Sequence, residues 1–292
     1  MKRTNYLVRY LLVALLLLVA GSLLLQPSGA QRSNARRKRP VPARAASLPP
    51  HAASPSPAKP PLPRAYLNAV KDAETAEPKE ISRNLVAINE SEPGLLWRGA
   101  GDDRRVRVVT WTSYPGYNCQ EGRTMKLPQR LPAIWVTAVP ELKKFCARLP
   151  RRVRNRTLRL EQLLGLPPRR GYTMFVEMWI KPADLFRPSP DPEIVDHEAV
   201  LALNSKYLRV DEVYGTWFEN NKSTYTGDPP FPWTRLGYTY DWGNPKSKVG
   251  LSEFGVAAGA EAVVESVTPT LDYCRGAQHR RSRVPARPPC AP

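Results

Sequence analysis

The stretch over residues 31–65 constrains the fold of this chain more than any other feature. It holds nine prolines and eight Lys or Arg residues, with no Asp or Glu and no Phe, Tyr or Trp. A segment of this composition buries too little apolar surface to offset the chain entropy that folding removes. We therefore predict a disordered, semi-extended linker over 31–65 and a folded body after it.

The segment before this linker has the pattern of a targeting sequence. Lys2 and Arg3 precede an apolar run over 10–25, and three small residues follow at 28–30. This pattern predicts that residues 1–30 are a secretory signal peptide or an uncleaved membrane anchor. We expect an extracytoplasmic protein that is secreted, periplasmic or membrane-anchored. The alternative is a cytoplasmic body behind a retained helix, which the basic residues after the run would favour.

The net charge belongs mainly to the ends of the chain. The sequence has 44 Lys and Arg against 26 Asp and Glu, for a net charge of +18. Residues 1–65 and 275–292 together carry 16 of these basic residues and no acidic one, so the body over 66–274 is nearly neutral. Binding of nucleic acid by the body is therefore disfavoured, whereas the basic linker and the disordered tail over 275–292 suit an anionic membrane or envelope surface.

The body over 66–274 alternates strand and helix patterns. We expect strands near 106–113, 133–136, 172–180, 250–256 and 262–267, and helices over 140–149 and 158–164. Thr157 is the expected cap of the second helix, and Gly165 its stop. This order predicts a single α+β domain with a mixed or antiparallel sheet, a few short helices and a long aromatic, turn-rich segment.

Aromatic residues are concentrated over 207–242, which contains ten of the 25 in the chain. One interpretation is a core-packing segment that covers a sheet face. The other is a stacking platform for a ligand such as a sugar. On the second interpretation, the predicted ligand-binding residues are Trp217, Trp233, Tyr238, Tyr240, Asp241 and Trp242.

The four cysteines predict disulfides in an exported protein. Pairing Cys119 with Cys146 and Cys274 with Cys290 is the most local of the three connectivities. The alternative is a nucleophilic Cys119 activated by His197, which is the only histidine in the body.

Carboxylates supply a second catalytic hypothesis. Glu177 lies within an apolar strand pattern, and Asp241 or Glu253 is its expected partner in cleavage of a glycoside. The simpler interpretation is that these acids are solvated or paired with cations.

Metal and cofactor sites are not expected. The acidic run over 191–198 has one histidine and no regular ligand spacing, so we predict the first turn of a helix, capped by Asp191. No glycine pattern for nucleotide binding follows an expected strand.

A basic patch is predicted within the body, to hold an anionic polymer or to form a solvated face. Its residues are Arg148, Arg151, Arg152, Arg154, Arg156 and Arg159.

Together these features predict an exported, envelope-associated binding or structural protein. Its expected partner is a glycan, an anionic envelope polymer or another protein. The alternatives are an exported hydrolase of wall or glycan substrates, acting through a carboxylate pair or Cys119 with His197, and a cytoplasmic nucleic-acid binder.

Overall fold

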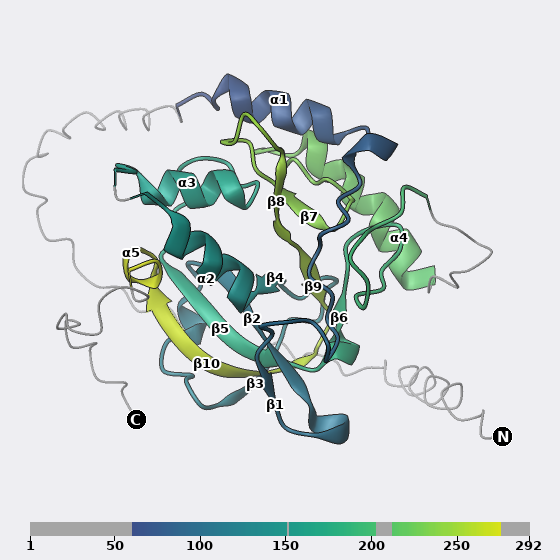
Figure 1. Ribbon diagram of the computed structural model, residues 1–292, viewed down its shortest axis with the longest axis vertical. Helices are drawn as coiled ribbons and strands as arrows, with labels where there is room; N and C mark the ends of the chain where they lie inside the picture. Colours follow the sequence, from purple (N-terminus) through teal and green to yellow (C-terminus); the bar gives the residue numbers. More distant parts are fainter. Residues whose placement is uncertain (1–59, 151, 203–211, 276–292) are drawn as a thin grey trace, which may run out of the picture. The chain divides into compact units, whose positions relative to one another are not determined.

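An antiparallel sheet organises the folded part of the chain (Figure 1). The computed structural model describes residues 60–150, 152–202 and 212–275. The expected targeting segment, most of the linker and nearly all of the tail lie outside these residues, as do Arg151 and Tyr207. Within the described residues the predicted α+β class is confirmed.

The main sheet has eight strands in the described residues, in the order β3-β10-β5-β2-β4-β9-β6, with β1 paired to β2. The long strands β2, β5 and β10 lie side by side at its centre (Figure 1). The bounds are β1 Trp97–Arg98, β2 Arg105–Thr112, β3 Thr124–Lys126, β4 Trp135–Ala138, β5 Met174–Ile180, β6 Leu185–Phe186, β9 Phe254–Val256 and β10 Glu261–Pro269. Strands β7 (Tyr238–Tyr240) and β8 (Val249–Ser252) form a separate antiparallel pair.

The two faces of the sheet follow from the alternation of side chains along its strands. Val176, Met178 and Ile180 of β5 pack into one buried cluster, as their spacing predicts. Phe175 points the other way and joins a second cluster that also contains Val109 and Trp111 of β2. Strands β2 and β5 therefore each contribute to two cores, whereas β10 contributes Ala262, Val264 and Val267 to the first cluster.

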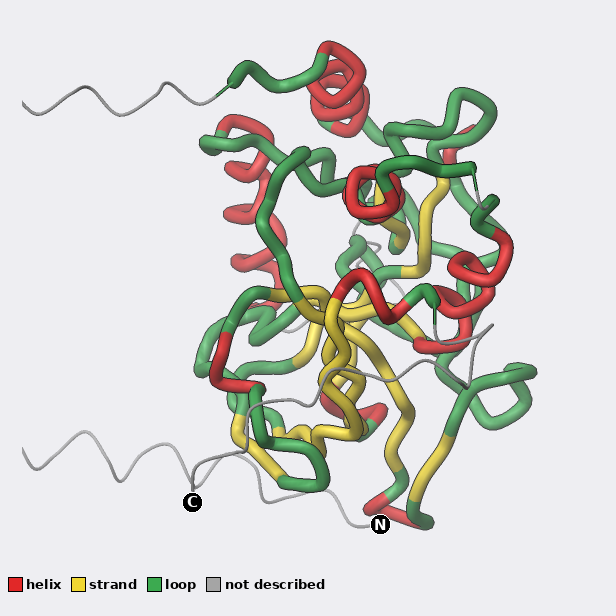
Figure 2. Tube along the Cα trace, turned by 90° about the vertical axis from the view of Figure 1, so that its left-hand side faces the viewer, coloured by secondary structure: helices red, strands yellow, loops and turns green. Residues whose placement is uncertain are grey.

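Short helices cover the second cluster and the region beyond it. Leu142 of α2 (Val139–Arg148), Leu160 of α3 (Arg156–Leu163) and Tyr273 of α5 (Thr270–Tyr273) pack against the second cluster. Helices α1 (Arg64–Ala73) and α4 (Glu212–Asn220) contribute to a third, aromatic-rich cluster. In Figure 2 most helical segments lie in the upper part of the view and the long strands in the lower part.

The expected elements differ from the observed ones in several details. The expected strand 250–256 is divided into β8 and β9 at Glu253, and α1 and α4 were not anticipated. Asn155, and not Thr157, caps α3, because its side chain accepts the N–H of Leu158 at 2.9 Å. Gly165 does end this helix with a left-handed conformation (φ +66°), as predicted.

The predicted helix at 191–198 is wrong, because this segment is a loop. The carboxylates bond the N–H groups of the loop itself: Asp191 accepts from Glu193 at 3.1 Å, and Glu193 accepts from Val195 at 3.0 Å. Such local bonds stabilise turns in competition with a helix.

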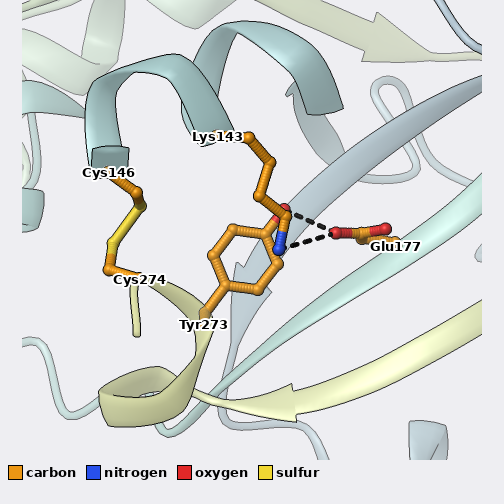
Figure 3. Close-up of a disulfide and its surroundings, with 5 residues drawn as sticks. All are labelled: Lys143, Cys146, Glu177, Tyr273 and Cys274. Atoms are coloured by element: carbon orange, nitrogen blue, oxygen red, sulfur yellow. Dashed lines mark hydrogen bonds and ion pairs between the residues drawn. A yellow bond between two sulfur atoms is a disulfide. The ribbon is translucent and has the colours of Figure 1, made fainter. Parts of the chain in front are cut away.

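The predicted pairings of Cys119 with Cys146 and of Cys274 with Cys290 are also wrong. Cys146 of α2 is bonded to Cys274, which follows α5 (Figure 3). The last strand, β10, leads directly into α5, and α5 packs beside α2 in the second cluster. Proximity in the fold therefore overrides proximity in sequence. The disulfide indicates folding in an oxidising environment, as expected for an extracytoplasmic protein.

Candidate functional site

The strongest candidate site is a cavity of about 430 Å³ beside β2 and β4. It is lined by residues 109–112 of β2, 134–137 around β4, 164–166 after α3 and 231–233 before β7, with further single residues from other loops. Its volume lies in the range of about 300–1,000 Å³ that is typical of small-molecule sites. We call it the aromatic cavity.

Aromatic side chains dominate its walls. Trp111 stacks on Phe175 with 5.2 Å between ring centroids, and the Trp111 indole Nε1–H donates to Thr270 Oγ1 at 2.7 Å. These contacts hold one wall in a fixed orientation. The other aromatic side chains that line the cavity are Tyr117, Trp135, Tyr172, Phe231, Trp233 and Tyr240.

Glu253 is the one carboxyl among the described residues that line the cavity. It lies between β8 and β9, and its backbone N–H donates to the carbonyl of Gly237 at 2.9 Å. Its side chain is half-buried and makes no hydrogen bond or ion pair with the described residues. Burial without a compensating partner raises the pKa of this carboxyl to about 8. At neutral pH the group is mostly protonated and is therefore a hydrogen-bond donor as well as an acceptor.

Trp233 provides a second unsatisfied polar group. Its side chain lines the cavity and is 6% exposed, and its indole Nε1–H has no partner among the described residues. The backbone around it is well held, because the Trp233 carbonyl accepts the Tyr225 hydroxyl at 2.6 Å. A buried donor without an acceptor costs about 1–3 kcal/mol.

Two arginines complete the lining. Arg130 and Arg170 line the cavity but are exposed to solvent, so they lie where it opens. Neither forms an ion pair with a carboxylate in the part of the chain that the structure describes. The cavity thus combines cations at its opening with aromatic walls and uncharged donors inside.

The structure divides the predicted ligand-binding residues between this cavity and the core. Trp233 and Tyr240 line the cavity. Trp217 packs against Trp233 at 5.8 Å, behind the wall. Tyr238 is buried, with its hydroxyl donating to the carbonyl of Glu80 at 2.9 Å, and Trp242 Nε1–H donates to the carbonyl of Leu166 at 3.0 Å. Much of the aromatic segment therefore packs as core.

Asp241 has a structural partner and does not line the aromatic cavity. It is 3% exposed, and both of its oxygens accept from Arg159, at 2.8 and 2.6 Å. This bidentate pair joins α3 to the chain that follows β7. Arg159 is therefore paired with a carboxylate, unlike a basic-patch residue that is free to bind an anionic polymer.

The other arginines of the basic patch present a solvated face. Arg148, Arg152 and Arg154 are exposed and Arg156 is half-buried. No ion pair is formed by these four within the described residues.

Glu177 is also held by neighbours outside the cavity. Its Oε2 lies 2.7 Å from Arg107 Nη2, and its Oε1 accepts the Tyr273 hydroxyl at 2.8 Å and lies 3.3 Å from Lys143 Nζ (Figure 3). The structure therefore does not bring Glu177, Asp241 and Glu253 into one cavity.

The hypothesis that Cys119 is a nucleophile activated by His197 is wrong. Cys119 is disulfide-bonded and so has no thiol to ionise. The His197 ring Nδ1 lies 2.7 Å from the carbonyl of Leu85, and its Nε2 lies 3.8 Å from Glu92. Among the described residues no cluster of His, Cys, Asp or Glu has the form of a metal site.

The sequence did not identify Arg130 and Arg170 as cavity residues, and it did not identify most of the residues that form the cavity wall. Trp111 was visible as part of a strand, but nothing in its spacing showed that residues 164–170 and 231–233 would lie opposite it. Arg170 belongs to the same basic stretch as the predicted patch, and only its contacts distinguish it.

The fold and the cavity define an α+β protein with a cavity lined mainly by aromatic residues. Comparisons of this chain with protein families, with curated proteins and with solved structures find no match. No helix of the described residues is long and apolar enough to cross a membrane.

Proposed function

We propose that this chain is an exported, envelope-associated binding protein whose aromatic cavity holds a ring of its ligand, such as a sugar unit of an envelope glycan. The observation that carries the proposal is the cavity itself, which has the volume of a small-molecule site and mainly aromatic walls. Aromatic faces stack on the apolar faces of rings, and isolated donors inside fix the orientation of the ligand.

The export part of the proposal is supported by the N-terminal sequence pattern and by the disulfide between Cys146 and Cys274. The basic linker suits a position near an anionic surface. Cell fractionation tests this part independently of the ligand, because a cytoplasmic pool with reduced cysteines would contradict it.

Blocking the cavity tests the binding part. Thr224 lines the cavity and is half-buried, whereas its neighbour Ser223 is exposed and does not line it. We expect Thr224→Trp to fill the cavity and abolish binding of N-acetylglucosamine oligosaccharides and other soluble glycan fragments, measured by calorimetry. Ser223→Trp is the matched control and should bind as the wild type does. Equal binding by both variants would contradict the proposal, as would the absence of binding by the wild-type protein.

A hydrolase acting through Glu253 is the second candidate, because a protonated carboxyl at neutral pH is suited to general acid catalysis. Against it, no second carboxyl lines the cavity in the described residues. Release of reducing ends from the same fragments by the wild type, and its loss in Glu253→Gln, would favour this candidate.

A further inference from the structure

We infer that the aromatic cavity selects rings that carry an anionic group, a carboxylate or a phosphate, and that Arg170 binds this group at the opening with Arg130 beside it. The inference rests on the proposed function, because it names the chemical class of the ring that the cavity takes. Three features of the structure carry it: the fixed position of Arg170, its Nη atoms without a hydrogen-bond partner among the described residues, and the neutral Glu253 carboxyl in the lining.

Arg170 is held in place before any ligand binds. Its backbone N–H donates to Glu161 Oε1 at 2.8 Å, and Glu161 is itself 2% exposed. Its Nε donates to the Tyr172 hydroxyl at 3.2 Å. Its guanidinium carbon lies 5.6 Å from the centre of the Tyr172 ring and 5.4 Å from that of Phe231, and both of these rings line the cavity.

This arrangement leaves the binding end of the side chain open. Neither Nη atom of Arg170 has a hydrogen-bond partner among the described residues. A guanidinium offers parallel donors that match the two oxygens of a carboxylate or a phosphate, and it does so best when its plane is already fixed.

The charges around the cavity favour an anion. Arg130 and Arg170 contribute two positive charges at the opening, and the only carboxyl in the described lining is Glu253. Because Glu253 is mostly neutral at pH 7, the lining has a net positive charge there. A ligand with an anionic group gains from this charge, whereas a cationic ligand is disfavoured.

The interior of the cavity suits the uncharged ring of the ligand. The protonated Glu253 carboxyl is a donor in the lining, and Trp233 is one of the aromatic residues there. The carboxyl suits the hydroxyl, ring or carbonyl oxygens of an uncharged ring, and an aromatic face suits its apolar face. The structure therefore places the anionic group of the ligand at the opening and the ring body inside.

Calorimetric titration of the wild-type protein with three related probes tests this assignment. The probes are D-glucuronate, glucose 6-phosphate and D-glucose, so that the first two distinguish a carboxylate from a phosphate on nearly the same ring. We expect one or both anionic probes to bind on the order of 10-fold to 100-fold more tightly than glucose, as charge-assisted hydrogen bonds allow. Added salt should weaken only the anionic probes.

Two matched variants assign the effect to Arg170. Arg170→Gln should remove the preference for the anionic probe over glucose. Arg169→Gln removes the same charge from an exposed neighbour that does not line the cavity, and it should retain the preference.

The outcomes separate the inference from the proposed function. If glucose binds as tightly as the anionic probes, or if Arg170→Gln keeps the preference, the inference is overturned and the binding function stands. If none of the probes and none of the glycan fragments binds, both are overturned.

Discussion

The protonation of Glu253 gives the sharpest quantitative prediction. Replacing this residue by Gln keeps the size of the side chain and removes its ability to ionise. In the folded protein the carboxyl has a pKa of about 8, against 4.5 for the exposed group. The native state therefore holds this proton more tightly than the unfolded chain does.

The sign of the pH dependence follows from this difference. Where the native state binds more protons than the unfolded state, stability falls as pH rises. The contribution of Glu253 is fully present below about pH 4.5 and is lost as the pH rises through about 8. Each unit of pKa difference corresponds to about 1.4 kcal/mol, so the whole window amounts to at most about 5 kcal/mol. Water that enters the cavity solvates the ionised Glu253 carboxylate and makes the free-energy difference smaller than this upper limit.

Urea denaturation at pH 5 and pH 9 measures the effect. We expect the wild type to lose more unfolding free energy between these two values than Glu253→Gln does, by up to about 4 kcal/mol. Glu141 contributes to the slope of both proteins, because burial raises its pKa to about 7. The comparison of the two proteins cancels that contribution.

Glu219→Gln is the control, because Glu219 is exposed and paired only with Lys222 on the surface. Its pH dependence should match that of the wild type. Equal pH dependence in wild type and Glu253→Gln would refute the reasoning, since it would mean that Glu253 is solvated and that the cavity is not a low-dielectric site.

Three other predictions concern the ligand, the disulfide and the buried ion pair. Binding of an anionic probe should weaken as pH rises through about 8 in the wild type and not in Glu253→Gln, because ionisation of Glu253 adds a negative charge to the lining. The double variant Cys146→Ser with Cys274→Ser should lose up to about 5 kcal/mol in urea denaturation, because the bond closes a loop with a sequence separation of 128; unchanged stability would contradict this. Asp241→Asn should lose about 3 kcal/mol, because Arg159 keeps its charge without its partner, whereas Asp228→Asn, at an exposed site, should lose little.

The sheet could be predicted because its signals are local. The alternation of apolar residues in β5 and the β-branched run in β2 identify strands and their buried faces without reference to the rest of the chain. Helix α4 was missed because it contains Gly215 and several aromatic residues, which are weak helix formers, and it is stabilised by packing in the third cluster.

The disulfide and the cavity could not be predicted because they depend on contacts between distant segments. Cys274 reaches Cys146 only after β10 has paired with β5 along its length. Glu253 was recognised as a candidate from its residue type, and Trp233 from the density of aromatic residues around it. That the two line one cavity with Arg170 depends on how three loops pack, which no local pattern encodes.

The indole N–H of Trp233 offers the most direct test of the central claim, that the aromatic cavity is a ligand site. In a ¹H–¹⁵N correlation spectrum of the wild-type protein, the Trp233 indole resonance can be assigned by its loss in Trp233→Phe. Titration with D-glucuronate or glucose 6-phosphate should shift this resonance, because Trp233 lines the cavity and a bound ligand changes the surroundings of its ring. The Trp179 indole, which already donates to Glu265 at 2.7 Å, should not move. An unmoved Trp233 resonance at concentrations where calorimetry reports saturation would contradict the account.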